Sequence, residues 1–270
     1  MLALVVAVRA DEAELASDVL WSMGVVAIEE RSVADRVELW TSLGDGVDAV
    51  TTAVSEVLAR WSWRLVEVDE TVADTWRANA MPVYVDADLV ICPAWVPFEP
   101  EAGVRVLRIE PGSTFGLGDH PSTMLSMSAI QAVMFDRARV LDVGCGSGVL
   151  SIGACVLGAS HATAIDIAPA SIPVTRANAE ANGVADRVEV SNTSLAEVDG
   201  QFDIVVANIL APVLIDLADD LRGVVAAGGV LIISGVLADR HDHVEAALLP
   251  LRRTRRRTRD GWAALTLSAP

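Results

Sequence analysis

The sequence contains no lysine, and its 20 basic residues are all arginine. This usage, beside abundant Ala, Val, Asp and Gly, is typical of a GC-rich genome. The 37 acidic residues outnumber the basic ones, so the formal net charge is −17. A surplus of this size repels phosphate backbones and anionic lipid, except where a local basic patch overrides the overall field. The composition therefore favours a basic protein or a cationic substrate as the partner.

Cysteine is scarce, and Cys92, Cys145 and Cys155 form neither a C-x-x-C pair nor a disulfide ladder. Their spacing is typical of a protein in the reducing cytoplasm and predicts no structural metal site. The longest uncharged run, residues 223–238, is too short for a membrane span and contains a glycine pair. The N-terminal LALVVAV has no basic residues before it, so we interpret it as a strand rather than a signal core. We therefore expect a cytoplasmic protein without membrane contact.

Residues 140–166 are the most informative stretch, because a hydrophobic strand leads into three alternating glycines, a helix and a second strand that ends in a carboxylate. The glycines are Gly144, Gly146 and Gly148, and the carboxylate is Asp166. A glycine turn between strand and helix lets backbone N–H groups approach a ligand, and an acid about 20 residues further on can hold ribose hydroxyls. The pattern predicts a nucleoside-binding site.

The glycine spacing distinguishes between nucleoside ligands. A dinucleotide pyrophosphate requires G-x-G-x-x-G, whereas this loop reads G-x-G-x-G and continues with Val149. Asp142, just before the loop, is poorly placed for a pyrophosphate and well suited to a cationic ligand. The loop therefore favours S-adenosylmethionine, a sulfonium with an amino-acid tail, and argues against an NAD-dependent enzyme.

The first 68 residues have a strand and helix order of their own. Apolar stripes such as Leu15, Val19 and Met23 indicate two helices among four strands. The order β-α-β-β-α-β predicts a small ferredoxin-like domain. Its tryptophans are expected to fill a small core, although an exposed recognition surface is the alternative. The expected elements are strands 2–9, 25–30, 36–41 and 63–68, with helices 11–23 and 47–60.

The remainder of the chain predicts an α/β domain. Residues 69–84 are expected to form a helical linker, and residues 85–270 a Rossmann-like sheet whose parallel strands alternate with helices on both faces. Asp260-Gly261 predicts a tight turn in a terminal antiparallel hairpin, which is typical of Rossmann-like methyltransferases. The expected strands are 88–92, 104–109, 139–143, 161–166, 187–191, 202–207, 229–234, 251–259 and 262–268.

With these elements placed, nearly the whole chain resembles the ribosomal protein L11 methyltransferase family. The resemblance implies methylation of amino groups, mainly lysines, of a ribosomal protein that the N-terminal domain (1–68) holds. The same chemistry on another protein or a small amine, and a non-catalytic interaction module, remain alternatives. The matching stretches are DTWRANAMPV, LVICPAW, IEPGSTFGLGDHPST, VLDVGCGSGVLSIGA, AIDIAPASIPVTRANAEANGV, FDIVVANILA and GGVLIISGVL.

The resemblance places S-adenosylmethionine contacts at Thr123, Gly144, Asp166 and Asn208. Thr123 offers a hydroxyl in the first turn of a helix, and a buried amide at Asn208 needs a partner because leaving it unpaired costs roughly 1–3 kcal/mol. Asp142, just before the glycine loop, and Gly146 within it complete the predicted cofactor site.

Two parts of this predicted site also bear on catalysis. Asn208 and the FGLGDH loop are expected to shape the amine pocket, and His120 in that loop is a candidate proton shuttle. The reaction expected is in-line displacement of the sulfonium methyl by a neutral amine, driven by positioning rather than by a strong base. The family usually reads FGTG where this chain has Leu117, which leaves the substrate open.

Six arginines at 252–259 form the one strongly basic stretch. On a regular strand Arg253, Arg255, Arg257 and Arg259 would share one face and could contact RNA. An exposed edge strand whose charges prevent aggregation is the alternative that we favour.

Overall fold

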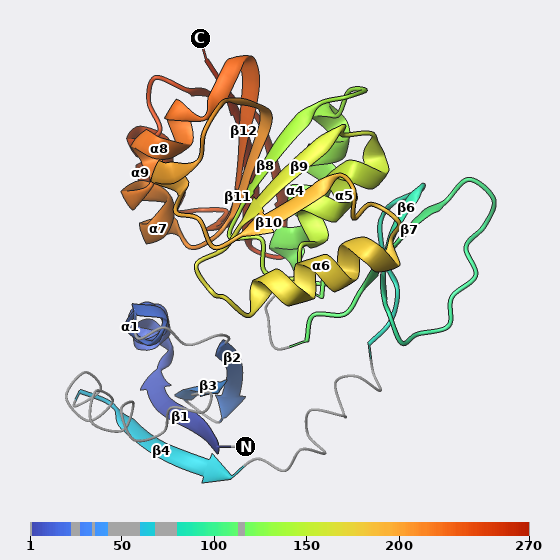
Figure 1. The fold of residues 1–270 in the computed structure, drawn as a ribbon. Coiled ribbons are helices and arrows are strands. Elements are labelled where there is room, and N and C mark those ends of the chain that lie inside the picture. Colours follow the sequence, from blue (N-terminus) through green and yellow to red (C-terminus); the bar gives the residue numbers. More distant parts are fainter. Residues whose placement is uncertain are drawn as a thin grey trace. The chain divides into compact units, whose positions relative to one another are not determined.

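The computed structural model describes residues 2–22, 28–33, 36–42, 60–67, 80–112 and 117–269. The chain divides into two compact units, Met1–Ala80 and Met81–Pro270, which Figure 1 draws in blue to cyan and in cyan to red. Among the described residues, every helix is too short or too polar to cross a membrane.

The N-terminal unit is a four-stranded antiparallel sheet with the order β2-β3-β1-β4. This pairing agrees with the β-α-β-β-α-β arrangement expected for this unit. The helix expected over 47–60 and most of the linker expected over 69–84 lie outside the described residues. The described elements are β1 (Leu2–Arg9), the short 3-10 helix η1 (Ala10–Glu12), α1 (Ala13–Ser22), β2 (Ile28–Val33), β3 (Arg36–Ser42) and β4 (Ser62–Glu67).

Helix α1 buries a different stripe from the one expected. Leu15 is 44% exposed, whereas Ala13, Ala16 and Leu20 are buried against β1 and β3. The expectation was wrong at Leu15 because it counted only large apolar side chains, and the buried face of this helix includes two alanines. Val19 packs at the border of the core, and Met23 lies outside the described residues.

Three tryptophans of this unit have described side chains, and they lie on both sides of its sheet. Trp61 and Trp63 pack against the core. Trp40 follows the buried Leu39 on β3 and therefore points to the other face, where the Arg31 guanidinium carbon lies 4.1 Å from the ring centroid. The core interpretation holds for Trp61 and Trp63 and not for Trp40.

The second unit contains a seven-stranded sheet with the order β10-β9-β8-β11-β12-β14-β13. The first five strands are parallel, and β14 is antiparallel to both β12 and β13. The expected parallel sheet with a terminal antiparallel hairpin is confirmed. The strands are β8 (Arg139–Val143), β9 (His161–Ile165), β10 (Val188–Ser191), β11 (Phe202–Asn208), β12 (Val225–Leu237), β13 (Arg252–Arg259) and β14 (Trp262–Ser268).

Helices cover both faces of this sheet, as Figure 1 shows. On one face α4 and α5 pack on alternate strand residues such as Val140 and Val206, and on the other α7, α8 and α9 pack on Leu141 and Val205. Adjacent strand residues thus supply the two cores. The helices are α4 (Pro121–Val133), α5 (Val149–Leu157), α6 (Ser171–Ala181), α7 (Ala211–Asp216), α8 (Ala218–Gly223) and α9 (Asp242–Ala247), with the short 3-10 helix η2 (Leu195–Glu197).

A second, three-stranded sheet precedes α4. It comprises β5 (Val83–Asp86), β6 (Leu89–Pro93) and β7 (Arg105–Ile109) in that spatial order. Strands β6 and β7 were expected from the sequence, whereas the four-residue β5 was not. Leu89, Ile91, Leu107 and Ile109 join the core beneath α4 and α5, so this small sheet extends the main domain.

The terminal hairpin contains an irregularity that the sequence analysis did not foresee. Arg253 pairs with Leu267 and Arg255 with Thr266, so Thr254 is an extra residue that forms a β-bulge. Because neighbouring residues on β14 point to opposite faces, Arg253 and Arg255 do so too. The expectation that Arg253 shares a face with Arg255, Arg257 and Arg259 was wrong. Arg252 instead joins those three, and Arg253 and Arg256 lie on the opposite face.

Candidate functional site

The glycine loop joins β8 to α5 in a conformation that L-amino acids rarely adopt. Gly144, Gly146 and Gly148 have φ angles of +76°, +54° and +80°. The Gly144 and Cys145 N–H groups donate to the Ile165 carbonyl oxygen at 2.9 and 3.1 Å, which fixes the loop to the carboxyl end of β9. The three glycines are therefore required by the backbone itself.

Close packing is a second reason for glycine in this loop. A Cβ on Gly144 would lie 2.5 Å from Cγ2 of Ile209, and one on Gly148 would lie 2.6 Å from Cγ2 of Thr175. Ile209 follows β11, and its carbonyl oxygen would lie 2.6 Å from a Cβ on Gly235. The segment after β11 is therefore held between two glycines, one from the loop and one from β12.

Asp142 lies beneath the loop and is almost fully buried, with 1% of its surface exposed. Oδ2 accepts the N–H of Ser151 at 3.0 Å, whereas Oδ1 has no hydrogen-bond partner. Burial raises the pKa of this carboxyl to about 7, with a smaller contribution in the same direction from the Asp166 carboxylate. A buried acid with one unpaired oxygen is costly to ionise unless a positive group is placed beside it.

Asp166 is the first residue after β9 and is held by two backbone groups. Oδ2 accepts the N–H of Gly146 at 2.8 Å, and Oδ1 accepts the N–H of Ala168 at 2.8 Å. The carboxylate is therefore oriented and joined to the glycine loop, and each oxygen keeps one lone pair for a ligand hydroxyl. Ile167, beyond the carboxyl end of β9, is 94% exposed, although isoleucine is among the residues most often buried.

Asn208 and Thr123 meet although 85 positions separate them. The Nδ2 group of Asn208 donates to Oγ1 of Thr123 at 3.3 Å, and Thr123 is buried in the first turn of α4. The buried Ser234 on β12 supports this arrangement, because its hydroxyl donates to the Ser122 carbonyl oxygen at 3.1 Å. The structure therefore brings Thr123, Asn208 and the glycine loop to the carboxyl ends of β8, β11 and β12.

His120 caps the helix that carries Thr123. Its Nδ1 accepts the N–H of Ser122 at 3.2 Å and lies 2.7 Å from the Ser122 hydroxyl oxygen. The imidazole also contacts the Trp262 ring edge to face, with centroids 4.9 Å apart. Burial lowers the pKa of His120, outweighing the nearby Asp119, so the ring is neutral at pH 7. These contacts position α4, and the proton-shuttle role stays a prediction.

Leu117 and Gly118, in the FGLGDH loop, precede α4. Leu117 is half-buried, and Gly118 is buried with φ of +104°. A Cβ on Gly118 would lie 2.5 Å from Cγ2 of Ile91, so the end of the loop packs directly on the small sheet. Residues 113–116 lie outside the described part of the chain.

Two asparagines on α6 are structural features that the sequence analysis missed. Asn178 and Asn182 each accept a backbone N–H and donate to the carbonyl oxygen of the same residue, Glu110 and Arg108 respectively, at 2.7–2.9 Å. Asn178 also donates to the Ser147 carbonyl oxygen at 2.9 Å. One helix face thus satisfies the free edge of β7 and joins it to the glycine loop. The available signal was a pair of amides one turn apart on a predicted helical segment.

The order of this sheet, with its last strand inserted antiparallel beside β12, and the glycine loop followed by Asp166 define the catalytic domain of a class I methyltransferase.

A family model described as "Ribosomal protein L11 methyltransferase (PrmA)" matches residues 1–269, and the chain belongs to that family. A ribosomal protein L11 methyltransferase of Citrifermentans bemidjiense is 42% identical over 208 residues, which are 75% of this chain and 68% of that protein. One from Streptococcus equi subsp. zooepidemicus is 32% identical over 235 residues, which are 83% of this chain and 74% of that protein.

A solved structure gives the same result. The ribosomal protein L11 methylase of Lactobacillus delbrueckii subsp. bulgaricus superimposes with a TM-score of 0.66 at 34% identity, covering 70% of this chain and 98% of that one. The resemblance stated from the sequence motifs is confirmed.

Proposed function

We propose that this chain transfers the methyl group of S-adenosylmethionine to amino groups of ribosomal protein L11, lysine side chains among them, in the cytoplasm. The two units take separate roles: residues 1–68 hold the protein substrate, and the second unit, which begins at Met81 rather than at the predicted residue 85 because β5 (Val83–Asp86) belongs to it, catalyses. The observation that carries the proposal is the convergence of Gly146, Asp166, Asn208 and Thr123 at one end of the sheet.

The residues at this end of the sheet fit the methyl donor. Asp166, fixed by two backbone N–H groups, is suited to accept from both ribose hydroxyls. The exposed Ile167 provides an apolar surface for the nucleobase. The unpaired Oδ1 of the buried Asp142 supplies a negative group for the α-ammonium group at the donor's amino-acid end. Gly144 allows the backbone to approach the ligand closely.

When bound, S-adenosylmethionine supplies an electrophilic methyl group: the amine nitrogen bonds to its carbon as the carbon–sulfur bond breaks, with the electron pair staying on sulfur. A lysine amine has a pKa of about 10.4, so it has to lose its proton to water before attack. The role of this chain is to desolvate and align the neutral amine, and alignment alone can supply several kcal/mol. Asn208, held by Thr123, is the polar group best placed for that task.

Asp166→Asn tests the donor site. The substituted amide would turn its NH₂ group toward the N–H of either Gly146 or Ala168, and one ribose acceptor would be lost. A hydrogen bond to a charged group contributes roughly 1.5–3 kcal/mol, so we expect about 30-fold weaker binding of S-adenosylmethionine by calorimetry.

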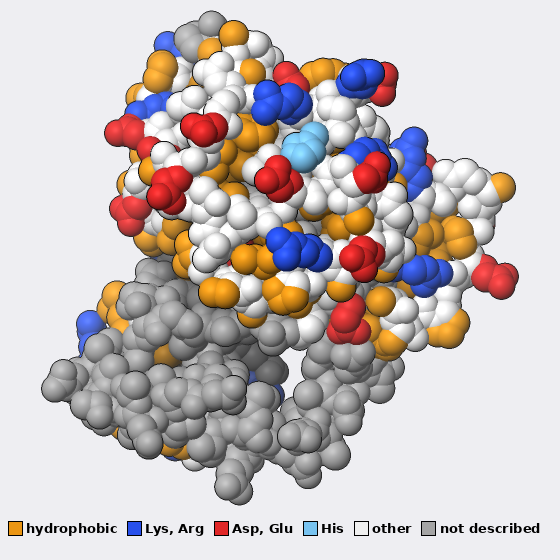
Figure 2. Space-filling view, in the orientation of Figure 1, with side chains coloured by type: hydrophobic (Ala, Val, Ile, Leu, Met, Phe, Trp, Pro, Cys, Tyr) orange, Lys and Arg blue, Asp and Glu red, His pale blue; other side chains and the backbone are white. Residues whose placement is uncertain are grey.

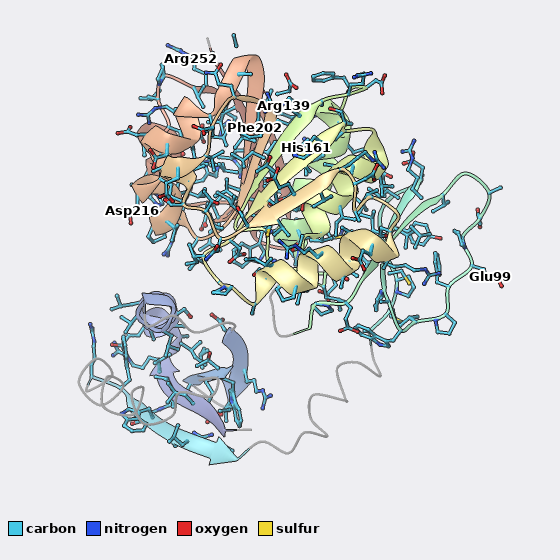
Figure 3. The ribbon with its side chains drawn as sticks, viewed as in Figure 1. Glu99, Arg139, His161, Phe202, Asp216 and Arg252 are labelled. Carbon is cyan, nitrogen blue, oxygen red and sulfur yellow. The ribbon has the colours of Figure 1, made fainter. Side chains whose placement is uncertain are left out.

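Asp203→Asn is the matched control for that measurement. Asp203 also accepts a backbone N–H at 2.8 Å, from Arg139, at the amino ends of β8 and β11. Arg139 and the neighbouring Phe202 are labelled in Figure 3, where they mark the end of the sheet away from the glycine loop. The control is expected to bind the donor as the unchanged chain does. Equal affinity in both variants would remove Asp166 from the donor site.

Replacing Asn208 by alanine separates catalysis from binding. We expect turnover on purified L11 to fall about 100-fold, because the side chain aligns the amine. The affinity for the donor is expected to fall by no more than about tenfold. Thr123→Val, which keeps the volume and removes the partner hydroxyl, is expected to reproduce part of the loss. Full turnover in the Asn208 variant would contradict the role.

Mass spectrometry identifies the substrate. Purified L11 incubated with this chain and S-adenosylmethionine is expected to gain mass in steps of one methyl group. Because the enzyme has no lysine, any lysine-side-chain label comes from the substrate. Donor binding without transfer to L11 would instead favour another protein or a small amine, and the absence of donor binding would favour a non-catalytic module.

A further inference from the structure

Strand β13 concentrates positive charge at the free edge of the main sheet. It pairs with β14 on one side only, and seven of its eight residues are exposed. Figure 2 shows basic and acidic side chains interspersed over the visible face of the second unit, whereas β13 carries arginine at six of eight positions. Such a strip on a chain of net charge −17 is a local reversal of the overall field.

The bulge at Thr254 divides these arginines into two sets. On the α9 side, Arg253 is paired with the Glu245 carboxylate at 2.7 Å, and Arg256 donates to the Ala238 carbonyl oxygen at 2.7 Å. Both have a partner in the protein itself. This set therefore contributes to the structure of the edge.

The other set, on the α4 side, is defined as the arginine row: Arg252, Arg255, Arg257 and Arg259. Within the described part of the chain, the first three form no ion pair, and Arg259 contacts only the exposed Asp260, at 3.5 Å. The pKa of Arg257 is lowered by partial burial and by the charge of the neighbouring Arg255 in the row.

Helix α4 and strand β14, which flank the row, provide no counter-charge. The sequence of α4 is PSTMLSMSAIQAV and that of β14 is WAALTLS, and neither contains an acidic residue. Blocking edge-to-edge pairing needs charge on the edge strand, and Arg253 and Arg256 on the opposite face already supply it. Four arginines on the other face, three of which form no ion pair with the described residues and lie beside uncharged elements, exceed that requirement and indicate an anionic ligand.

The arrangement of the row identifies the kind of ligand. Alternate strand residues lie about 6.7 Å apart, so the row is a line of guanidinium groups suited to a linear chain of phosphates. β13 contains only arginine and threonine, and therefore lacks both the apolar side chains that insert into lipid and the aromatic anchors of a protein interface. We propose that the arginine row binds the phosphate backbone of single-stranded RNA.

The proposal is tested by anisotropy of a labelled, unstructured RNA titrated with the full chain at several salt concentrations. Each neutralised phosphate on a single strand contributes a slope of about −0.7 to log K against log salt, so four contacts predict a slope of about −3. The variant Arg255→Ser/Arg257→Ser is expected to weaken binding at least tenfold and to reduce the slope to about −1.5.

Arg253→Ser/Arg256→Ser is the matched control, because it removes the same charge from the same strand on the opposite face. We expect its affinity to stay within threefold and its slope to change by less than 0.5. Equal losses in both variants would overturn the assignment to one face. RNA binding weaker than millimolar, or equal binding of a polyglutamate peptide or phosphatidylserine vesicles, would overturn RNA as the ligand.

This proposal does not rest on the methyltransferase activity. RNA binding is measured without the methyl donor, and methylation of purified L11 by Arg255→Ser/Arg257→Ser is expected to match that of the unchanged chain. Failure of one measurement therefore leaves the other interpretable.

Discussion

Gly235→Ala is expected to reduce methylation of L11 about 100-fold. The new Cβ would lie 2.6 Å from the carbonyl oxygen of Ile209 and 3.2 Å from its backbone nitrogen. Backbone cannot rotate away as a side chain can, so Ile209 has to move. It is directly bonded to Asn208, and a displacement near 1 Å at a reacting centre costs on the order of 100-fold. Turnover is measured by mass spectrometry of L11 under saturating donor.

Gly228→Ala is the control for backbone strain. Gly228 lies on the same strand with φ of +79°, against +81° at Gly235, and a Cβ there would meet no atom within 4 Å. Both alanines incur the same conformational cost, about 1–2 kcal/mol. Thermal unfolding should therefore shift in both variants, and activity should collapse only at Gly235. Similar activities in the two variants would show that the position of Ile209 does not matter for turnover.

Asp142→Asn is expected to stabilise the fold and to weaken donor binding at the same time. The folded-state pKa of about 7 lies above the ordinary value of 3.8, so the folded chain holds this proton more tightly than the unfolded chain. The associated stability is complete below pH 3.8 and is lost as the pH rises through 7. At pH 8 the variant avoids burying an ionised carboxylate and should unfold several degrees higher, since each pKa unit corresponds to about 1.4 kcal/mol.

The same carboxylate should make donor binding depend on pH. A cationic ligand favours the ionised form, so the affinity of the unchanged chain is expected to rise about tenfold from pH 6 to pH 8. The asparagine variant should bind the donor about 100-fold more weakly at pH 8, and its affinity should depend less on pH. The donor itself titrates in the same way with both proteins, so the pH dependence that remains in the variant corrects for that effect. A variant that binds as tightly as the unchanged chain would rule out Asp142 as the counter-charge.

Strong local signals were read correctly from the sequence. Strand β8 covers Arg139–Val143, as expected, and the turn at Asp260 and Gly261 has the positive φ values that its residue types predict. The glycine loop and Asp166 were found because both obey a spacing set by one strand-helix-strand unit. In each case the information lies within about 25 consecutive residues.

The errors came from features that depend on a partner element. The bulge at Thr254 arises from pairing with β14, and no pattern within β13 distinguishes Arg253 from Arg255. The link between Asn178 and Glu110 joins residues far apart in the chain, so neither position alone indicates it. Leu15 was misplaced because the buried face of α1 includes Ala13 and Ala16, and alanines carry little hydrophobic signal.

The place of β14 constrains how the domain is made. It is the last of the seven strands to leave the ribosome, yet it lies between β12 and β13 rather than at an edge. Until it arrives, the long β12 presents an unpaired border and the arginine-rich β13 has no neighbour to pair with. The nascent domain therefore stays open to misassociation until Ser268 has emerged, and deletion of residues 262–268 should yield an aggregating product rather than a smaller folded one.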